Sequence, residues 1–462
     1  MSNNKLIRNT LLLTIGTLVN KGLLFIMIPF FSRWISTSDY GTFDLICTYV
    51  TLFIPIIDLA TGEAMFRFSV EDQSKDNLSK QFTNGIAIVI INLFLYSIII
   101  IILQNIFKFS NLIPFMLLLI GELLNNYLRA VLRAVKRLDI YSLSSAISVI
   151  IIVIFTIVFI KIFNLGLTGI ILGYGIGYIL GNLIIIIWIK LWKHINIKQI
   201  SLSNCKQMIA YSLPLIPNNV SWWIMNVSDR LIINIFLGPI ANGIYAIANK
   251  VPALCTSIFG MFSISWQQSA IENVDNGKEE RDNYFNSIYN NTILIMISLC
   301  IGLLSINFIL FDYIFDSKYN NARMYVPILI TAIIFSTLCQ FFGGIQISFK
   351  ETKENGISTI WGAVINIITN LIFIKSIGIY AAAISTFISY FCVAIIRYMR
   401  IREKIKFKIK NETKFFILVY VYFVFIVYIN TSIISKILNI ILAILIFLLI
   451  NSKFIFSIIK KY

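Results

Sequence analysis

Long runs of apolar residues separated by short polar segments alternate along the whole chain. An α-helix needs roughly 20 mostly apolar residues to cross the hydrocarbon core of a bilayer, and most of these runs are that long. The pattern predicts an all-α polytopic membrane protein with about fourteen transmembrane helices. The expected spans are 7–31, 43–63, 83–106, 111–132, 141–162, 165–189, 209–237, 241–265, 288–311, 325–347, 357–375, 377–398, 414–432 and 434–456.

An internal repeat divides these spans into two sets of six. Tyr40–Phe43 opens the second span and Asn242–Tyr245 opens the eighth, at an offset of 202 residues. Because six is an even number, both halves insert with the same orientation, as in the parallel repeats of many transporters. We therefore expect an N-terminal six-helix lobe over 1–198 and a C-terminal six-helix lobe over 199–400. A basic cytoplasmic linker and helices 13 and 14 follow over 401–462.

Composition and charge support a membrane location. The chain is 58% hydrophobic and 13% charged, whereas a soluble domain carries about a quarter charged residues. The net charge of +17 would suggest nucleic acid in a soluble protein, but here basic loops orient the helices and contact anionic lipid. With the N-terminus inside, the inner side holds 28 of the 38 basic residues, eight of them in 397–414, and the outer side holds seven. This bias predicts cytoplasmic N- and C-termini in a bacterial cytoplasmic membrane.

The residues that usually carry enzyme or metal chemistry are scarce. His194 is the only histidine, and the six cysteines form no CxxC pair. No metal site, disulfide framework or cofactor is therefore indicated. No sizeable outer loop or soluble domain interrupts the spans, so we expect a transporter and not an enzyme.

Basic and polar residues inside the spans are the candidate substrate site. An ionisable group at the centre of a span costs at least ~2.5 kcal/mol on insertion scales, so it normally faces a cavity. Lys21, Arg230 and Lys250 come from both halves and are expected roughly 10–15 Å below the outer surface. We predict that they bind an anion in a water-filled cavity. Asn226 and Trp222 share the helical face of Arg230, and Arg129 belongs to a polar face of the fourth span.

Other roles for these basic residues remain open at this point. Arg230 could pair with Asp229 or Asp58, and Lys21 with Glu122, as bridges between helices. Arg129 could extend to lipid phosphates at the cytoplasmic surface. The acidic residues Asp58, Glu122 and Asp229 are candidate sites for a coupling ion, H+ or Na+, or counter-ions of a neighbouring base.

Several stretches resemble the polysaccharide repeat-unit flippases, the Wzx-type members of the multidrug/oligosaccharidyl-lipid/polysaccharide (MOP) superfamily. They are Ser228–Asn234 with Gly238, Asn242–Ala246 with Lys250, and Ser36 with Asp39–Phe43. The resemblance runs through spans 1–12. It implies two six-helix lobes around a cationic cavity and, as substrate, an oligosaccharide on undecaprenyl pyrophosphate that is moved to the outer leaflet by alternating access. Arg230 and Lys250 match family positions that face the cavity, and Lys21 matches less regularly.

The resemblance implies partners as well as competing functions. The expected partners are the lipid-linked oligosaccharide and membrane lipids, with a polysaccharide polymerase and glycosyltransferases as candidates, and no nucleic acid. A lipid II flippase or a cation-coupled multidrug exporter of the same superfamily would share the fold. A membrane polysaccharide polymerase or ligase is the alternative from another class.

Overall fold

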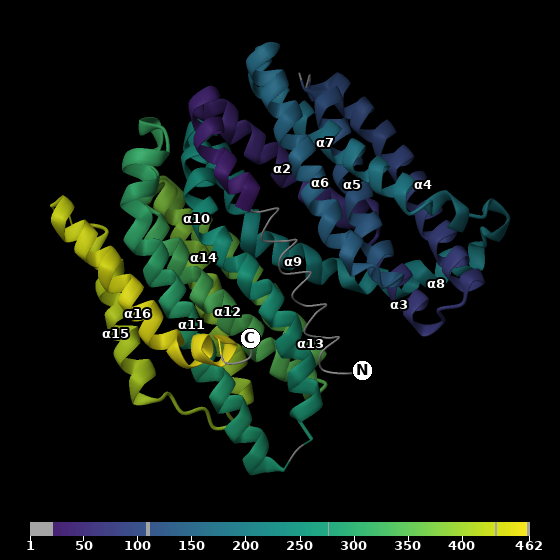
Figure 1. The fold of residues 1–462 in the computed structure, drawn as a ribbon. Coiled ribbons are helices and arrows are strands. Elements are labelled where there is room, and N and C mark those ends of the chain that lie inside the picture. The colour runs from purple at the N-terminus through teal and green to yellow at the C-terminus, as the bar shows by residue number, and fades with distance from the viewer. Residues whose placement is uncertain (1–21, 108–110, 276, 430–431, 460–462) are drawn as a thin grey trace. The chain divides into compact units, whose positions relative to one another are not determined.

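The computed structural model of the chain describes residues 22–107, 111–275, 277–429 and 432–459. Within these ranges every regular element is helical (Figure 1). Inter-residue contacts divide the chain into two compact units, Met1–Trp223 and Ile224–Tyr462. The sequence prediction placed the first boundary earlier, after residue 198.

The first unit is a set of helices that pack mainly on α5 and α7. The α6–α7 and α5–α7 interfaces are its most extensive ones. A short apolar helix, Gly22–Trp34, precedes α2. The elements are α2 (Thr37–Ile57), α3 (Thr61–Glu71), α4 (Lys75–Phe107), α5 (Leu112–Ala134), α6 (Leu138–Ile157), the π-helical turn η1 (Val158–Ile162), α7 (Gly166–Trp188), the 3-10 turns η2 (Leu191–His194) and η3 (Ile197–Gln199), α8 (Leu202–Ser212), the 3-10 turn η4 (Leu213–Leu215) and α9 (Ile216–Val227), which crosses into the second unit.

The second unit has its most extensive interfaces between α12 and α14, α13 and α14, and α10 and α12. The C-terminal helices α15 and α16 both pack on α11. The elements are α10 (Asp229–Asn273), α11 (Lys278–Ile309), the π-helical turn η5 (Leu310–Ile314), the 3-10 segment η6 (Ser317–Met324), α12 (Val326–Ser348), α13 (Thr352–Ile377), α14 (Ile379–Ile401), α15 (Asn411–Ile426) and α16 (Ile433–Ile459).

The expected seventh span, 209–237, is not one helix. The chain forms α8, the turn η4, α9 and the start of α10 over this range, with breaks near Pro214 and at Ser228. Proline cannot donate a backbone hydrogen bond inside a helix, which explains the first break. A third break follows inside α10, where Gly238 has φ 83° and ψ 176° ahead of Pro239. Gly238 can adopt this conformation because it has no Cβ.

The expected second span, 43–63, is also broken. Helix α2 ends at Ile57, and Leu59 and Ala60 then have positive φ values of 49° and 52°. The Asp58 carboxylate accepts a hydrogen bond from the Ala60 N–H at 2.8 Å, which stabilises this turn before α3 begins. The polar residue at the break therefore has a structural role as a local cap.

Glycines allow the helices of the first unit to approach closely. A Cβ on Gly177 would lie 2.7 Å from Ile152 Cα, and one on Gly173 would lie 2.7 Å from Thr156 Cα. Gly181 faces Ser148 in the same way, so α7 presents three glycines spaced four residues apart to α6. Small residues at this spacing are typical of helix interfaces in membranes, where packing replaces the hydrophobic effect as the driving force.

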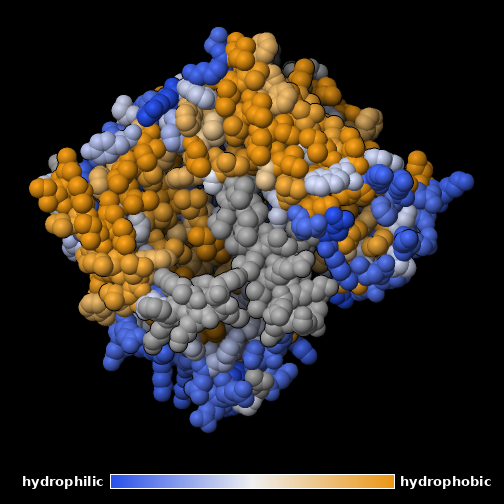
Figure 2. Space-filling model, viewed as in Figure 1, coloured by the Kyte–Doolittle hydropathy of each residue, from blue (hydrophilic) through white to orange (hydrophobic). Residues whose placement is uncertain are grey.

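The described part of the chain contains eleven segments that are long and apolar enough to cross a membrane. One of them, Leu202–Asn273, is 72 residues long and includes the broken region. Figure 2 shows hydrophobic residues over the face where α15 and α16 lie, and polar residues at the end of this unit where α10 turns into α11. The chain is thus an all-α membrane protein, while the number fourteen stays a prediction.

Candidate functional site

Arg230 lies at the start of α10, directly after the break at Ser228. Its side chain is half-buried, and its Nη1 lies 3.4 Å from the Asn226 carbonyl oxygen, to which it donates. The Asn226 side chain accepts a hydrogen bond from the Tyr390 hydroxyl of α14 at 2.7 Å. The α9–α10 junction is thereby attached to α14, and the Arg230 guanidinium stays partly accessible at a fixed position.

The bend at Gly238 folds α10 back on itself. Evidence for this is a hydrogen bond from the Tyr245 hydroxyl to the Asp229 carboxylate across the bend. Lys250 follows Tyr245 by five residues on the same helical segment after the bend. Lys250 is half-buried, like Arg230. Two of the three predicted basic residues, Arg230 and Lys250, thus belong to the second unit and lie on the two sides of the bend at Gly238.

A polar core surrounds Asp229 in the second unit. Asp229 is buried, and its carboxylate accepts hydrogen bonds from the Arg230 N–H at 2.9 Å and from the Thr386 hydroxyl of α14 at 3.4 Å. The neighbouring Ser228 hydroxyl donates to Asn366 Oδ1 of α13 at 3.3 Å. One turn along α13, Asn370 is fully buried, and neither polar atom of its side chain has a hydrogen-bond partner among the described residues.

The sequence analysis did not identify this contribution of α13 and α14. Asn366 and Asn370 are four residues apart in an apolar span, which places them on one helical face. That spacing was a readable signal, but only the tertiary structure places Asn366 of this face against Ser228, the neighbour of Asp229.

The predicted residues of the first unit have more local partners. Arg129 of α5 donates to the Tyr141 hydroxyl at 2.5 Å, and its guanidinium lies 4.4 Å from the centre of the same ring. Asp58 caps its own turn and also accepts from Asn126 Nδ2 at 3.2 Å. Trp222 is half-buried on α9. Lys21 lies outside the described residues.

Glu122 differs from the other acidic candidates. It is half-buried on α5, and within the described ranges it forms no hydrogen bond or ion pair. A bridge from Glu122 to Lys21 stays a prediction because Lys21 is not described.

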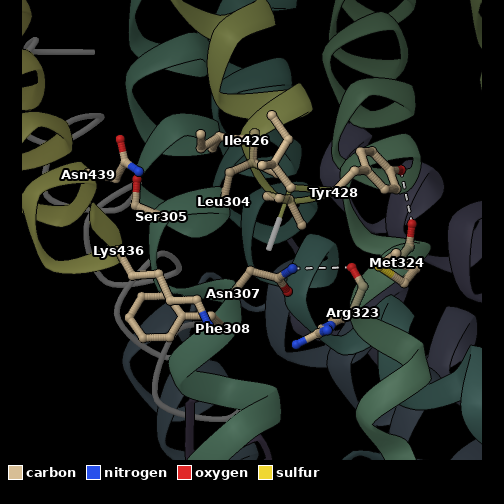
Figure 3. A pocket seen from close by; sticks show the side chains of 12 residues that line it. Leu304, Ser305, Asn307, Phe308, Arg323, Met324, Ile426, Tyr428, Lys436 and Asn439 are labelled. Carbon is tan, nitrogen blue, oxygen red and sulfur yellow. Dashed lines mark hydrogen bonds between the residues drawn. The ribbon is translucent and has the colours of Figure 1, made fainter. Parts of the chain in front are cut away.

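A small, partly open pocket occurs elsewhere in the second unit, among α11, η6, α15 and α16 (Figure 3). Its volume of about 90 Å³ corresponds to roughly three waters. Arg323 and Lys436, which both line it, form ion pairs with Asp312 at 3.0 and 3.3 Å. None of the predicted site residues that the structure describes lines this pocket.

The polysaccharide biosynthesis protein family matches residues 6–266, more than half of the chain. The chain belongs to this family. A curated relative, the probable low-salt glycan biosynthesis flippase Agl15 of Haloferax volcanii, is 23% identical over 197 residues. That alignment covers 42% of this chain and 42% of the relative, so the two are comparable over less than half of their lengths.

Solved structures show the same fold over most of this family member. The lipid II flippase MurJ in an inward closed conformation has a TM-score of 0.71 at 18% identity, covering 97% of this chain and 100% of MurJ. A MATE family transporter of the MOP superfamily in its inward-facing conformation has a TM-score of 0.64 at 14% identity, covering 85% and 94%. The chain thus shares its fold with these solved proteins, and the relative and the structures named here are flippases and transporters, not enzymes.

Proposed function

We propose that this protein is a flippase that moves an undecaprenyl-pyrophosphate-linked oligosaccharide from the cytoplasmic to the outer leaflet by alternating access, for surface polysaccharide synthesis. Its place is the bacterial cytoplasmic membrane, with both termini in the cytoplasm. Membership of the polysaccharide biosynthesis protein family supports the pathway. The pronounced excess of basic residues on one side of the expected spans supports the orientation.

The observation that carries the proposal is the anchored arginine at the α9–α10 break. Arg230 is placed by its contact with the Asn226 carbonyl, while the Asn226 side chain is held by Tyr390. A pyrophosphate carries about two negative charges, and moving them through hydrocarbon without partners is prohibitive. A guanidinium donates planar, bidentate hydrogen bonds to phosphate. It can therefore replace the water molecules that would otherwise hydrate the pyrophosphate.

The other predicted residues have distinct roles in this proposal. Lys250 and Lys21 add positive charge around the pyrophosphate, and Asn226 and Trp222 contact the glycan. Arg129, which is already bound to Tyr141, contacts the phosphates near the cytoplasmic end of α5. The lipid tail remains in the bilayer during transport.

Coupling to an ion gradient uses Asp229 in this proposal. Hard cations take oxygen ligands, and one carboxylate together with hydroxyl and amide oxygens supplies them. Asp229, Thr386, Asn366 and Asn370 offer such a set, and the unpartnered side chain of the buried Asn370 favours a polar ligand there. Asp58 and Glu122 are the further coupling candidates in the first unit.

The function is tested by replacing Arg230. We expect Arg230→Ala to abolish flipping of a fluorescent undecaprenyl-pyrophosphate oligosaccharide in proteoliposomes, and surface polymer in a deletion strain, while the protein still inserts. Arg230→Lys should be partly active, because it keeps the charge but not the fork of donors. Arg67→Ala, which removes an exposed arginine on α3, is the matched control.

Each competing function has its own outcome in the same assay. Normal transport by Arg230→Ala would contradict an anion site at this position. Preference for lipid II or for a cationic drug over the oligosaccharide lipid would assign the protein to another activity of the superfamily. A new glycosidic bond formed by the purified protein would identify a polymerase or ligase instead.

A further inference from the structure

The linker between α14 and α15 is an ordered strip with alternating side chains, Lys404-Ile-Lys-Phe-Lys-Ile-Lys410. Ile405 is fully buried, and Phe407 contacts the rings of Tyr289 and Phe342 at 5.0 and 5.7 Å between centroids. Successive residues of an extended chain point to opposite sides. Lys406, Lys408 and Lys410 accordingly share the other side, and all three are exposed.

Two asparagines of α11 hold the backbone of this strip. Asn286 donates to the Lys406 carbonyl at 3.0 Å and accepts from the Lys408 N–H at 2.7 Å. Asn290 repeats the arrangement one turn later, donating to the Lys408 carbonyl at 2.9 Å and accepting from the Lys410 N–H at 2.9 Å.

The distance between Asn286 and Asn290 along α11 matches the distance between alternate residues of the strip. Four residues of helix rise about 6 Å, and two residues of extended chain advance roughly 6.6 Å. Each side-chain amide can therefore pair with the strip as a neighbouring β-strand would. Asn286 and Asn290 also donate to the carbonyls four residues earlier in α11, at 2.8 and 2.9 Å. These contacts fix the amide orientations, and with them the register of the strip.

The ends of the strip are also attached. At the start, Lys404 forms an ion pair with Glu351 at 2.5 Å, and Arg281 donates to the Lys404 carbonyl at 3.3 Å. At the end, the Thr413 hydroxyl donates to Asn290 Oδ1 at 3.0 Å. In contrast, Lys406, Lys408 and Lys410 have no ion-pair or hydrogen-bond partner for their ammonium groups within the part of the chain that the structure describes.

We propose that Lys406, Lys408 and Lys410 form a binding site for the phosphate of an anionic phospholipid. The strip joins two apolar helices, α14 and α15 (Figure 1). A polar segment between two such helices belongs at the level of the lipid headgroups. Each lysine near an anionic surface contributes about 1 kcal/mol of attraction, equivalent to roughly fivefold in affinity. Holding the backbone of the three lysines at a regular spacing keeps their ammonium groups near one another and lowers the entropy lost when one headgroup binds.

A neighbouring pocket favours a lipid over an acidic protein as the ligand. Lys410 lines a cavity of about 590 Å³ that lies among α11, α15 and α16. Its other walls include the apolar side chains of Leu294, Phe416 and Leu449. A phospholipid joins in one molecule a phosphate for the lysines and acyl carbons for this apolar wall, so it matches both features.

The test measures phosphatidylglycerol binding to the full-length chain in detergent by native mass spectrometry, with phosphatidylcholine as the comparison. Changing Lys406, Lys408 and Lys410 together to Gln should weaken phosphatidylglycerol binding about 100-fold. The corresponding triple Arg variant should retain binding, which shows that the charges and not the lysine stems are needed. Phosphatidylcholine binding should change in neither variant.

Two further variants separate a built site from general charge. The double variant Asn286→Ala/Asn290→Ala keeps every lysine but releases the strip, and should weaken phosphatidylglycerol binding roughly tenfold. The control removes three exposed lysines of the first unit, Lys190, Lys193 and Lys198, and should change binding by less than about twofold if position matters more than net charge.

Three outcomes would overturn the proposal. They are wild-type binding by the triple Gln variant, wild-type binding by the double Asn variant, or an equal loss in the control triple. Competition by millimolar inorganic phosphate as effective as competition by short-chain phosphatidylglycerol would assign the site to a soluble anion and overturn the lipid assignment. None of these results depends on the proposed flippase activity.

Discussion

Arg397 and Arg230 differ in their surroundings, although both are arginines within helices of the second unit. The charge pattern assigned it to the basic linker 397–414, but the structure buries it inside α14, only 1% exposed. Its guanidinium donates to the Ser358 and Thr359 hydroxyls at 2.9 and 2.8 Å and to the Cys339 carbonyl at 2.7 Å. Arg397 therefore joins α12, α13 and α14, whereas Arg230 stays accessible for a ligand.

We expect Arg397→Ala to destabilise the second unit by about 2–5 kcal/mol, because it leaves a cavity and several acceptors without donors. Arg397→Lys should rescue little, since one ammonium cannot replace the guanidinium fork. Thermal unfolding in detergent would measure both effects. Arg400→Ala, an exposed position three residues later on the same helix, should leave the Tm nearly unchanged. Equal stability of the Arg397 and Arg400 variants would contradict the structural role.

Asp229 makes the coupling proposal testable at a single carboxylate. Asp229→Asn should lower the dependence of transport on the H+ or Na+ gradient by a factor of about 5 to 150, the usual range of coupling between two sites. Tyr245→Phe removes one hydrogen bond to the same carboxylate but keeps its charge, so gradient dependence should survive. Transport in proteoliposomes under imposed gradients would measure this.

The matched control for Asp229 is Asp275→Asn, an exposed acidic residue near the end of α10. It should transport like the wild type. If Asp229→Asn responds to both gradients as the wild type does, the coupling ion does not use this residue. The same comparison on Asp58→Asn and Glu122→Gln then examines the first unit.

Among the elements, α7 depends most clearly on small residues. Gly177→Ala would place a methyl group 2.7 Å from Ile152 Cα and 2.8 Å from Ile152 N. Because backbone atoms cannot move aside cheaply, α6 and α7 must separate, at a cost of about 1–3 kcal/mol. We expect a lower Tm in detergent and easier proteolysis of the first unit.

Gly302→Ala in the middle of α11 is the corresponding control, since a Cβ there meets no atom within 4 Å. Alanine is the better helix former, so this variant should be neutral or more stable by up to about 1 kcal/mol. A Gly177→Ala variant as stable as Gly302→Ala would show that α6 and α7 do not pack closely at this position.

At the scale of the whole molecule, the orientation of the spans predicted from the charge bias can be tested directly. The charge bias places residue 403 in the cytoplasm and residue 316 outside. In a variant without the six native cysteines, Asp316→Cys should react with an impermeant maleimide in intact cells, and Glu403→Cys only after permeabilisation. The reverse pattern would invert the topology. Labelling of both positions in intact cells would contradict the number of spans between them.

The sequence was sufficient to predict the class of the molecule. An all-α membrane fold, its family and Arg230 as a candidate follow from features that are local or repeated along the chain. Runs of about 20 apolar residues, basic loops and the Ser228–Asn234 stretch can each be read without knowing what they contact. The helix breaks were harder to predict, since Asp58 stabilises the turn after α2 by a side-chain hydrogen bond that many other polar residues could also form.

Partners across helices required the tertiary structure. Hydropathy cannot say which way a helix faces, because lipid tails are as apolar as a leucine-rich interior. The rotation of α13 and α14 is decided by packing and by hydrogen bonds such as that from Thr386 to Asp229. For the same reason, the sequence shows alternating lysines at 404–410, but only the amides of Asn286 and Asn290 hold them as a strip. The sequence alone therefore determines that this chain is a membrane protein. The fold determines which of its polar residues contact one another.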